Sequence, residues 1–430
     1  MGENVAIVAT NNLLLIFSII IITGIALGKL SEILKIPDVI LYLMAGVLIG
    51  PAFLNILSIA DFPVENNLIL TFGSAFILYE GGKEIKLRVL NKVKISVTLL
   101  STLGVVVSTV VVGVIAAKIF NIPLIIAILL GAVIASTDPA ALIPVFRQVK
   151  IKDKIKQTVV SESAFNDAVG AILSSAILGI VLSGKLSVSD SLKELLISAS
   201  VGVGVGIFIG YLLIILVSDK RIGIFSSYSP IMSILTVILA YEVALSFGGS
   251  GYMAVFMAGL IAGNKKLFGI WLPEADYHPT VHVTESIATI CRMSIFVLLG
   301  TQVNMSALAE YWLPSLLTVL VLMFIARPLS VLASTLVDRK AEWKIRDIVF
   351  MMWVRETGVI PAAVSGMIVA LKVPGYEIIS SVVFMTILVT LIIQASTTKL
   401  VAKWLGVLEE DQVEKEDAKG LTPSACNTQI

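Results

Sequence analysis

Long apolar runs recur along almost the whole chain and constrain its fold more than any other feature. A helix needs roughly 18–20 such residues to cross a bilayer. Hydrophobic residues make up 57% of the 430 residues and charged residues 14%, whereas soluble domains average about 25% charged residues. We therefore predict an all-α polytopic membrane protein. About thirteen spans are expected, at residues 12–30, 38–56, 65–81, 95–118, 122–147, 157–184, 191–218, 228–247, 250–264, 284–302, 313–336, 346–371 and 377–404.

The composition also narrows the partners and the chemistry. The formal net charge of +1 gives no indication of nucleic-acid binding. The sequence shows neither a nucleophile–base set nor a phosphate-binding loop. We expect membrane lipid as a partner, and neither enzymatic activity nor a cofactor.

Basic residues gather in alternate connections between the predicted spans, and the intervening connections hold few. Basic loops stay on the cytoplasmic side of a membrane. We therefore expect a protein of the cell membrane with its N-terminus outside and its C-terminus in the cytoplasm. Residues 406–430 would form a polar cytoplasmic tail. The connections after the third and fifth spans are examples, with Lys83, Lys86, Arg88, Lys92, Lys94, Arg147, Lys150, Lys152, Lys154 and Lys156.

Thirteen spans permit an inverted repeat. Spans 1–6 and spans 8–13 would have opposite orientations, and span 7 would bridge them. The fifth and twelfth spans, at matching places in this scheme, both contain helix breakers. Matching interruptions in the two halves are the best sequence indication of a transporter's binding site. We therefore predict two discontinuous helices that cross near the bilayer midplane.

The break in the fifth span is centred on Asp138 and Pro139. Proline inside a helix removes a backbone donor, and Asp followed by Pro is typical of a helix start. We expect two half-helices joined at Ser136 and Thr137, with Asp138 at the positive end of the second half. The Thr137 hydroxyl and the freed carbonyls would be hard oxygen ligands suited to Na⁺. The alternative is a proline kink whose polar groups satisfy one another.

The break in the twelfth span lies at Gly358 and Pro361. Arg355 precedes it, at the C-terminal end of the first half-helix, where a cation complements the helix dipole. Asp138 and Arg355 would then balance the exposed ends of the two broken helices. We rank this structural role above direct contact with an ion.

The sixth span carries the motif Glu162-Ser163-x-x-Asn166-Asp167. Charge at that depth costs several kcal/mol unless it faces a wet cavity or a partner. A carboxyl group taken out of water, without a permanent ion pair, can hold either a proton or a small cation. We predict that Asp167 holds the two alternately, that Ser163, one turn away, gives the cation an oxygen, and that Asn166 steadies the unwound backbone. Glu162 is expected to form a structural ion pair with Arg355.

Further charged side chains lie in predicted spans with roles left open. Glu80 ends the third span, and it either approaches the ion or remains at the membrane interface. Arg292 lies inside the tenth span and needs an acid partner, for which Glu356 is one candidate.

Taken together, these motifs resemble those of the NhaP/NHE branch of the monovalent cation/proton antiporters. The main likeness is Thr137-Asp138-Pro139 followed by the Glu162–Asp167 motif. It extends over roughly residues 12–405, with supporting segments at 34–37, 43–51, 249–260 and 295–300.

The resemblance implies a homodimer with a scaffold and a moving six-helix core. The scaffold would be residues 1–94 and 221–312, the core residues 95–184 and 313–405, and the linker helix residues 185–220. Elevator-like motion of the core would give alternating access.

The resemblance also implies roles for single residues. Asp167 would bind the ion and the proton, with Ser163, the Thr137 region and Glu80 as sources of further oxygens, and Glu162 would pair with Arg355. The pair Asn166-Asp167 stands where electrogenic relatives carry two aspartates. This difference suggests electroneutral exchange of one cation for one proton.

The sequence therefore predicts an electroneutral Na⁺ (or Li⁺)/H⁺ antiporter that serves pH homeostasis. A K⁺/H⁺ antiporter on the same scaffold is the nearest alternative, since the oxygen count and the cavity size decide between them. A cation channel would also suit broken helices, but a titrating, partly dry carboxylate favours stepwise exchange. A symporter of organic anions need not keep a lone carboxylate at Asp167.

Overall fold

The computed structural model describes residues 2–34, 36–57, 63–138, 146, 151–184, 188–218, 223–270 and 274–408. Within these ranges every regular element is a helix, apart from one isolated bridge between Ile151 and Leu408. The second half of the predicted fifth span and nearly all of the predicted polar tail lie outside the described residues.

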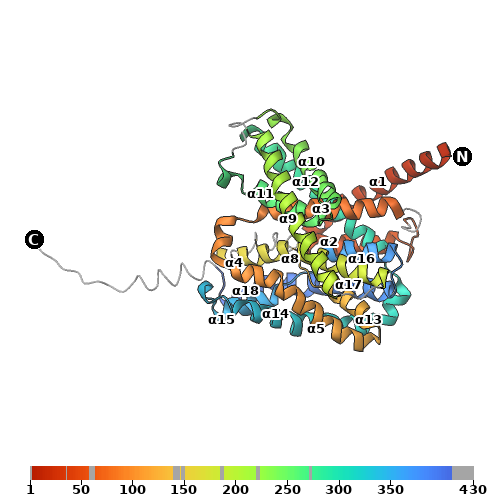
Figure 1. Ribbon diagram of the computed structural model, residues 1–430. Helices are drawn as coiled ribbons and strands as arrows, with labels where there is room; N and C mark the ends of the chain where they lie inside the picture. The colour runs from red at the N-terminus through yellow and green to blue at the C-terminus, as the bar shows by residue number, and fades with distance from the viewer. Residues whose placement is uncertain are drawn as a thin grey trace, which may run out of the picture.

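The described helices follow one another along the chain as Figure 1 shows. Those of the first half are α1 (Gly2–Leu34), α2 (Asp38–Ile49), α3 (Pro63–Glu84), α4 (Leu87–Ser101), α5 (Leu103–Phe120), α6 (Leu124–Val133), α8 (Asp153–Ser183) and α9 (Val188–Val217). Those of the second half are η2 (Ser226–Tyr228), α10 (Ser229–Ser246), α11 (Gly251–Gly263), η3 (Lys265–Phe268), α12 (Glu274–Thr301), α13 (Met305–Val321), η4 (Leu322–Ala326), α14 (Arg327–Thr335), η5 (Arg339–Ala341), α15 (Ile345–Trp353), α16 (Val359–Ala370), α17 (Tyr376–Val389), η6 (Thr390–Ala395) and α18 (Ser396–Leu405).

Several of these helices join into longer apolar segments. The π-helical turn η4 joins α13 to α14, η6 joins α17 to α18, and α4 meets α5 at Thr102. Among the described residues, eight helices are long and apolar enough to cross a membrane, and four shorter apolar helices accompany them. The prediction of an all-helical polytopic membrane protein is confirmed.

The helices pack in two groups that meet along α8 and α16. In the first group α11 packs on α3, α9 and α10, while α12 packs on α2, α3 and α10. In the second group α5 packs on α6 and α14, α4 on α8, and α13 and α16 on α17. Figure 1 shows the labelled α9–α12 above the part of the body that contains α5, α13 and α14. Between the groups, α16 contacts α3 and α12, and α8 contacts α3 and α11.

Glycines allow the closest helix contacts inside the first group. A Cβ atom on Gly46 of α2 would overlap the carbonyl of Val297 in α12, and one on Gly300 would overlap the carbonyl of Leu43. Small residues at such crossings let backbones approach closely, which is how helices in lipid gain packing energy. The contact fixes α2 against α12.

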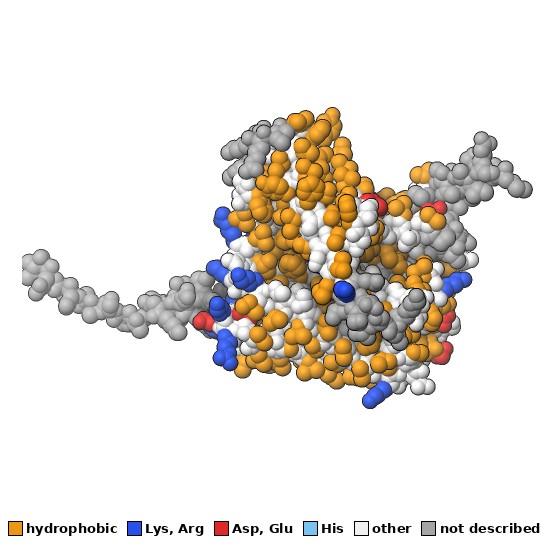
Figure 2. Space-filling view, viewed as in Figure 1, with side chains coloured by type: hydrophobic (Ala, Val, Ile, Leu, Met, Phe, Trp, Pro, Cys, Tyr) orange, Lys and Arg blue, Asp and Glu red, His pale blue; other side chains and the backbone are white. Residues whose placement is uncertain are grey.

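The outer surface suits a lipid environment. Figure 2 shows hydrophobic side chains spread over the visible face, while lysine and arginine side chains gather along one edge. Large apolar residues point outward, for example Phe208 at 64% exposed and Trp404 at 81% exposed. Exposed apolar side chains on this scale are expected where the surrounding medium is hydrocarbon.

Candidate functional site

Two helix breaks meet at the centre of the second helix group. In the first break, α6 ends at Val133, and the backbone through Asp138 is not helical. In the second break, α15 ends at Trp353 and α16 begins at Val359. The two non-helical segments are joined directly, because the Asp138 N–H donates to the Glu356 carbonyl at 2.8 Å.

The charged residue of each break stabilises a helix end that belongs to the other break. The guanidinium of Arg355 donates to the carbonyls of Ile134 and Ala135, at 3.0 and 2.7 Å, just beyond the end of α6. The carboxylate of Asp138 accepts from the Val359 N–H at 3.3 Å, at the start of α16. Both placements put charge where the helix dipole favours it. The sequence predicted balanced helix ends, but it did not show that each charge would reach across to its neighbour.

Gly358 is where the two breaks lie closest. A Cβ atom at this position would overlap the carboxyl group of Asp138. The φ of Gly358 is −150°, outside the left-handed region that favours glycine, and the neighbouring carboxyl group is a steric obstacle to a side chain here. The absence of a side chain lets the Asp138 carboxylate reach the N-terminus of α16.

We expect the substitution Gly358→Ala to lower the thermal stability of the purified protein, because overpacking a tight site costs about 1–3 kcal/mol. Gly179→Ala is the matched control, since nothing lies within 4 Å of a Cβ atom there. Thermal melting in detergent measures the difference. Equal melting temperatures for the two variants would show that Asp138 can move aside without loss.

The second break is also held from α17 and α18 through the π-helical turn between them. The side chain of Gln394 donates to the Trp353 carbonyl at 2.6 Å. The hydroxyl of Thr390 accepts from the Thr357 N–H at 3.2 Å. Both groups satisfy backbone atoms that the broken helix leaves without partners.

The predicted ion-binding residues come together beside the first break. The Asn166 side chain binds Thr137 twice, because its Oδ1 accepts from the Thr137 N–H at 3.0 Å and its Nδ2 donates to Thr137 Oγ1 at 2.9 Å. Thr137 Oγ1 in turn donates to Ser163 Oγ at 2.9 Å. The amide of Asn166 thus holds the unwound backbone of the fifth span against α8.

Asp167 lies next to this cluster on α8 and is 2% exposed. Its Oδ1 atom is buried and has no hydrogen-bond partner. Of the ion pairs that the described residues form, none involves Asp167. A buried carboxylate that is left without a basic partner needs a cation or a proton to offset its charge.

The predicted ion pair between Glu162 and Arg355 is wrong, because Glu162 pairs with Arg327. Its carboxylate is bound by the guanidinium of Arg327 from α14 through two hydrogen bonds, of which Nη2 to Oε2 measures 3.0 Å. Arg327 also donates to the carbonyls of Met351 and Val354 at the end of α15, at 3.1 and 3.3 Å. Arg355 instead directs its Nη2 atom to the carbonyls beyond α6.

Glu80 has a basic partner on its own helix in this structure. Its carboxylate forms an ion pair with Lys83, one turn further along α3, at 2.7 Å. Lys83 also donates to the Thr284 hydroxyl of α12. The place of Glu80 relative to the ion therefore stays a prediction, while its pairing with Lys83 is a feature of this structure.

Arg292 pairs with Asp38 across α12 and α2 at 3.4 Å, and not with Glu356. The Glu356 side chain is fully buried within the second break, and both of its carboxylate oxygens lack hydrogen-bond partners. The sequence alone could not pair these groups, because their helices are not neighbours along the chain.

The donor set is one for a hard cation and not for a transition metal. No group of three or more histidine, cysteine or acidic residues gathers in the part of the chain that the structure describes. Hydroxyl, carboxylate and carbonyl oxygens are the groups that meet at Thr137, Ser163 and Asp167. Oxygen ligands of this type suit small cations of the main groups.

Comparison with known proteins agrees with this chemistry. Residues 17–404 match the family described as "Sodium/hydrogen exchanger, transmembrane". The K⁺/H⁺ antiporter NhaP of Alkalimonas amylolytica is 30% identical over 404 residues, which are 92% of this chain and 67% of that protein. Na⁺/H⁺ antiporter 1 of Methanocaldococcus jannaschii is 32% identical over 417 residues, 90% of this chain and 93% of that protein. The solved structure of the sodium proton antiporter MjNhaP1 from Methanocaldococcus jannaschii at pH 8 has a TM-score of 0.79 at 28% identity, covering 93% of this chain and 99% of that one.

Proposed function

Because this chain belongs to the sodium/hydrogen exchanger family of membrane transporters, we propose that it exchanges one Na⁺ for one H⁺ at Asp167. The observation that carries the proposal is the buried Asp167 carboxylate, which has no basic partner in the described part of the chain and lies beside the Thr137–Ser163–Asn166 cluster.

The hydroxyl groups of that cluster have capacity left for a cation. Thr137 Oγ1 donates to Ser163 Oγ and accepts from Asn166, so one of its two lone pairs remains. Ser163 Oγ accepts one hydrogen bond and also keeps a lone pair. Asp167, Ser163 and Thr137 can therefore provide oxygens for Na⁺, while Asn166 keeps the two hydroxyls in place.

Competition at one carboxylate is sufficient for coupled exchange. A proton on Asp167 removes the negative charge that holds the cation, and a bound cation disfavours the proton. If the loaded core moves only when one of the two is bound, each cycle exchanges a single positive charge for another. The exchange is then electroneutral.

Sodium is the cation that we propose, and potassium is the competing candidate. One relative is named as a Na⁺/H⁺ antiporter and aligns over 93% of its length, and the structural relative is named as a sodium proton antiporter. The Alkalimonas relative, named as a K⁺/H⁺ antiporter, supports the alternative.

We propose that the chain has thirteen spans in an inverted repeat and works by elevator-like motion. The packing of the helices supports the motion. The proposed scaffold, residues 1–94 and 221–312, contains α1–α3 and α10–α12, which belong to the first packing group. The proposed core, residues 95–184 and 313–405, contains both breaks and α8. We propose that the two broken helices cross in this core and that it slides along α3, α11 and α12.

The lipid-facing surface supports a homodimer, and the charge distribution supports the proposed orientation. Helix α1 packs on α2 and α12 and leaves large apolar side chains exposed, among them Ile22 at 69%. A second copy could cover this face.

The basic edge in Figure 2 would be the cytoplasmic side, with the C-terminus there and the N-terminus outside.

Flux measurements on purified protein in liposomes test the proposal. A pH-sensitive dye inside the vesicles should report proton movement when Na⁺ or Li⁺ is added. The signal on addition of K⁺ should be much smaller. Vesicles clamped at several potentials with valinomycin should give the same Na⁺-driven rate, because no net charge moves. A response to K⁺ alone would assign the alternative cation, and a rate that follows the voltage would exclude one-for-one exchange.

A further inference from the structure

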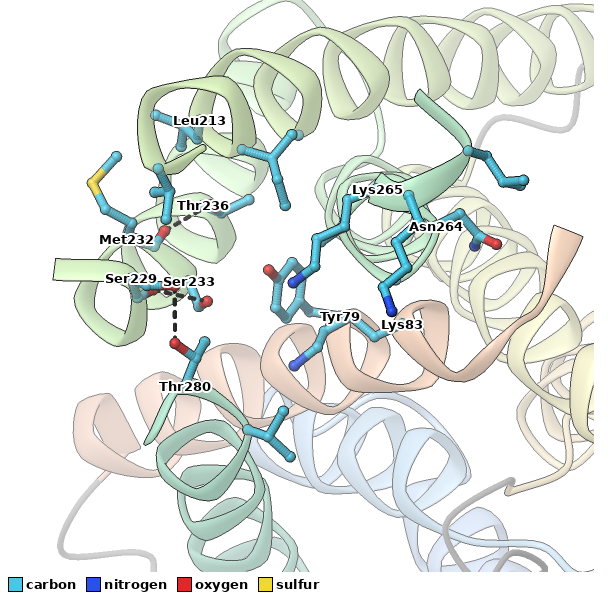
Figure 3. Close-up of a pocket in the computed structure, with 18 of the residues that line it drawn as sticks. Tyr79, Lys83, Leu213, Ser229, Met232, Ser233, Thr236, Asn264, Lys265 and Thr280 are labelled. Carbon is cyan, nitrogen blue, oxygen red and sulfur yellow. Dashed lines mark hydrogen bonds between the residues drawn. The ribbon is translucent and has the colours of Figure 1, made fainter. Parts of the chain in front are cut away.

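A cavity lined mainly by the first helix group lies apart from the ion site. Its volume is about 530 Å³, and it is bounded by α3, the start of α4, α9, α10, the end of α11, η3 and α12 (Figure 3). None of its lining residues belongs to α8 or to either helix break. The antiport reaction as proposed leaves this cavity without a role.

Among the residues whose side chains the structure describes, five basic residues line the cavity and no acidic residue does: Lys83, Lys86, Arg88, Lys265 and Lys266. Two acids, Glu80 and Glu84, lie at the same end of α3, and Glu80 is paired with Lys83. Positive charge therefore exceeds negative charge among the described lining residues.

The lysines are close enough to influence one another. Burial, followed by the charges of Lys83 and Lys266, lowers the pKa of Lys265 to about 8. Figure 3 shows Lys265 and Lys83 on either side of the Tyr79 ring, on the wall opposite Ser229 and Thr280. An anion in the cavity would relieve this repulsion between like charges.

The remaining walls differ in chemistry along their length. Leu213, Val217 and Met232, from α9 and α10, form an apolar side. Both helices are among those apolar enough to span the membrane. Ser229 and Thr280 add hydroxyl groups, with Thr280 Oγ1 donating to Ser229 Oγ at 2.9 Å.

This order of groups matches the anatomy of a phospholipid. The basic residues lie where α3 and α11 end, at Glu84 and Gly263, which is the level expected for headgroups. The apolar side continues along spanning helices toward the hydrocarbon. A free phosphate ion has no apolar part that could pack against that side. Basic pockets between membrane helices are established binding sites for anionic headgroups in other proteins.

We propose that this cavity binds an anionic phospholipid, with its phosphate among the lysines and an acyl chain against α9 and α10. The bound lipid ties α3 and α11 to α9, α10 and α12 at one membrane surface. Lipid binding thereby stabilises the first helix group.

The test uses full-length protein stripped of lipid in neutral detergent. Phosphatidylglycerol, phosphatidylcholine or inorganic phosphate is then added at equal phosphate concentrations, and thermal melting is followed. We expect phosphatidylglycerol alone to raise the melting temperature. In Lys86→Gln/Lys265→Gln, the half-effective lipid concentration should rise about 25-fold, because each basic side chain contributes about 1 kcal/mol to anionic lipid binding. This pair of substitutions leaves the Lys83–Glu80 ion pair intact.

The control variant Lys399→Gln/Lys403→Gln loses the same charge from the exposed face of α18 and should respond as the wild type. Lys265→Gln alone provides a milder variant should the double variant fold poorly. Equal stabilisation by phosphatidylcholine would overturn the proposal, and so would an unchanged response in the double variant. Stabilisation by inorganic phosphate alone would overturn the assignment of a lipid.

Discussion

Replacing Asp167 by asparagine is expected to reduce Na⁺-driven proton flux to the level of empty liposomes. The amide keeps the size of the side chain but can neither carry the exchanged proton nor offer a negative charge to Na⁺. Because the carboxylate is buried and has no basic partner among the described residues, its removal leaves none of their cations uncompensated. The variant should therefore fold and melt close to the wild type.

Two further variants make this result specific. Asp153→Asn removes a carboxylate from the exposed first turn of the same helix, and its flux should equal that of the wild type. Asp167→Glu keeps the charge but moves it by one methylene, so it should retain some flux with an altered Na⁺ affinity. Wild-type flux in Asp167→Asn would remove this residue from the exchange site, even if the protein proved to be an antiporter.

The elements of the fold and the residues of the cluster could be identified from sequence because both depend on local spacing. Apolar runs of spanning length predict helices in lipid whatever they pack against. The four-residue spacing places Ser163 and Asp167 on one face of α8, and the breaks follow from Gly358 and the Asp138-Pro139 pair. Each of these inferences needs only a few neighbouring residues. The predicted cluster of Thr137, Ser163 and Asn166 indeed has mutual hydrogen bonds.

The ion pairs could not be identified from sequence in the same way, because they join helices far apart in the chain. Two arginines in predicted spans, Arg327 and Arg355, were possible partners for Glu162, and the sequence analysis predicted Arg355. The structure uses Arg327, which is 165 residues away. A signal was present, since Arg327 is a cation inside a predicted span, as Arg292 is. What the sequence lacks is the knowledge that Arg355 would already be bound to the carbonyls beyond α6.

The basic partner of Glu80, by contrast, could be identified from the sequence. Lys83 follows it by three residues, and oppositely charged side chains at this spacing meet on a helix surface. The structure shows that pair at 2.7 Å. Local spacing therefore identifies the charged neighbour of Glu80, whereas its role near the ion stays a prediction from the likeness to antiporters.

The ion pair of Glu162 and Arg327 leads to the second large effect that we expect. Substituting Arg327→Met should lower the free energy of unfolding by about 3–5 kcal/mol, because removing one partner of a buried pair leaves the other charge without compensation. Three elements lose contact at once, since Arg327 joins α14 to Glu162 of α8 and to the carbonyls of Met351 and Val354 at the end of α15.

A double-mutant cycle separates the charge from the packing. The variant Glu162→Gln/Arg327→Met buries no lone charge, so it should recover part of the stability that Arg327→Met loses. Lys152→Met is the matched control, because the Lys152–Asp347 pair is longer, at 3.4 Å, and more exposed, and its loss should change melting little. The apparent Na⁺ affinity of whatever folded protein remains should stay near the wild-type value in all three variants. Loss of Na⁺ affinity with unchanged melting would show instead that Arg327 acts at the ion site.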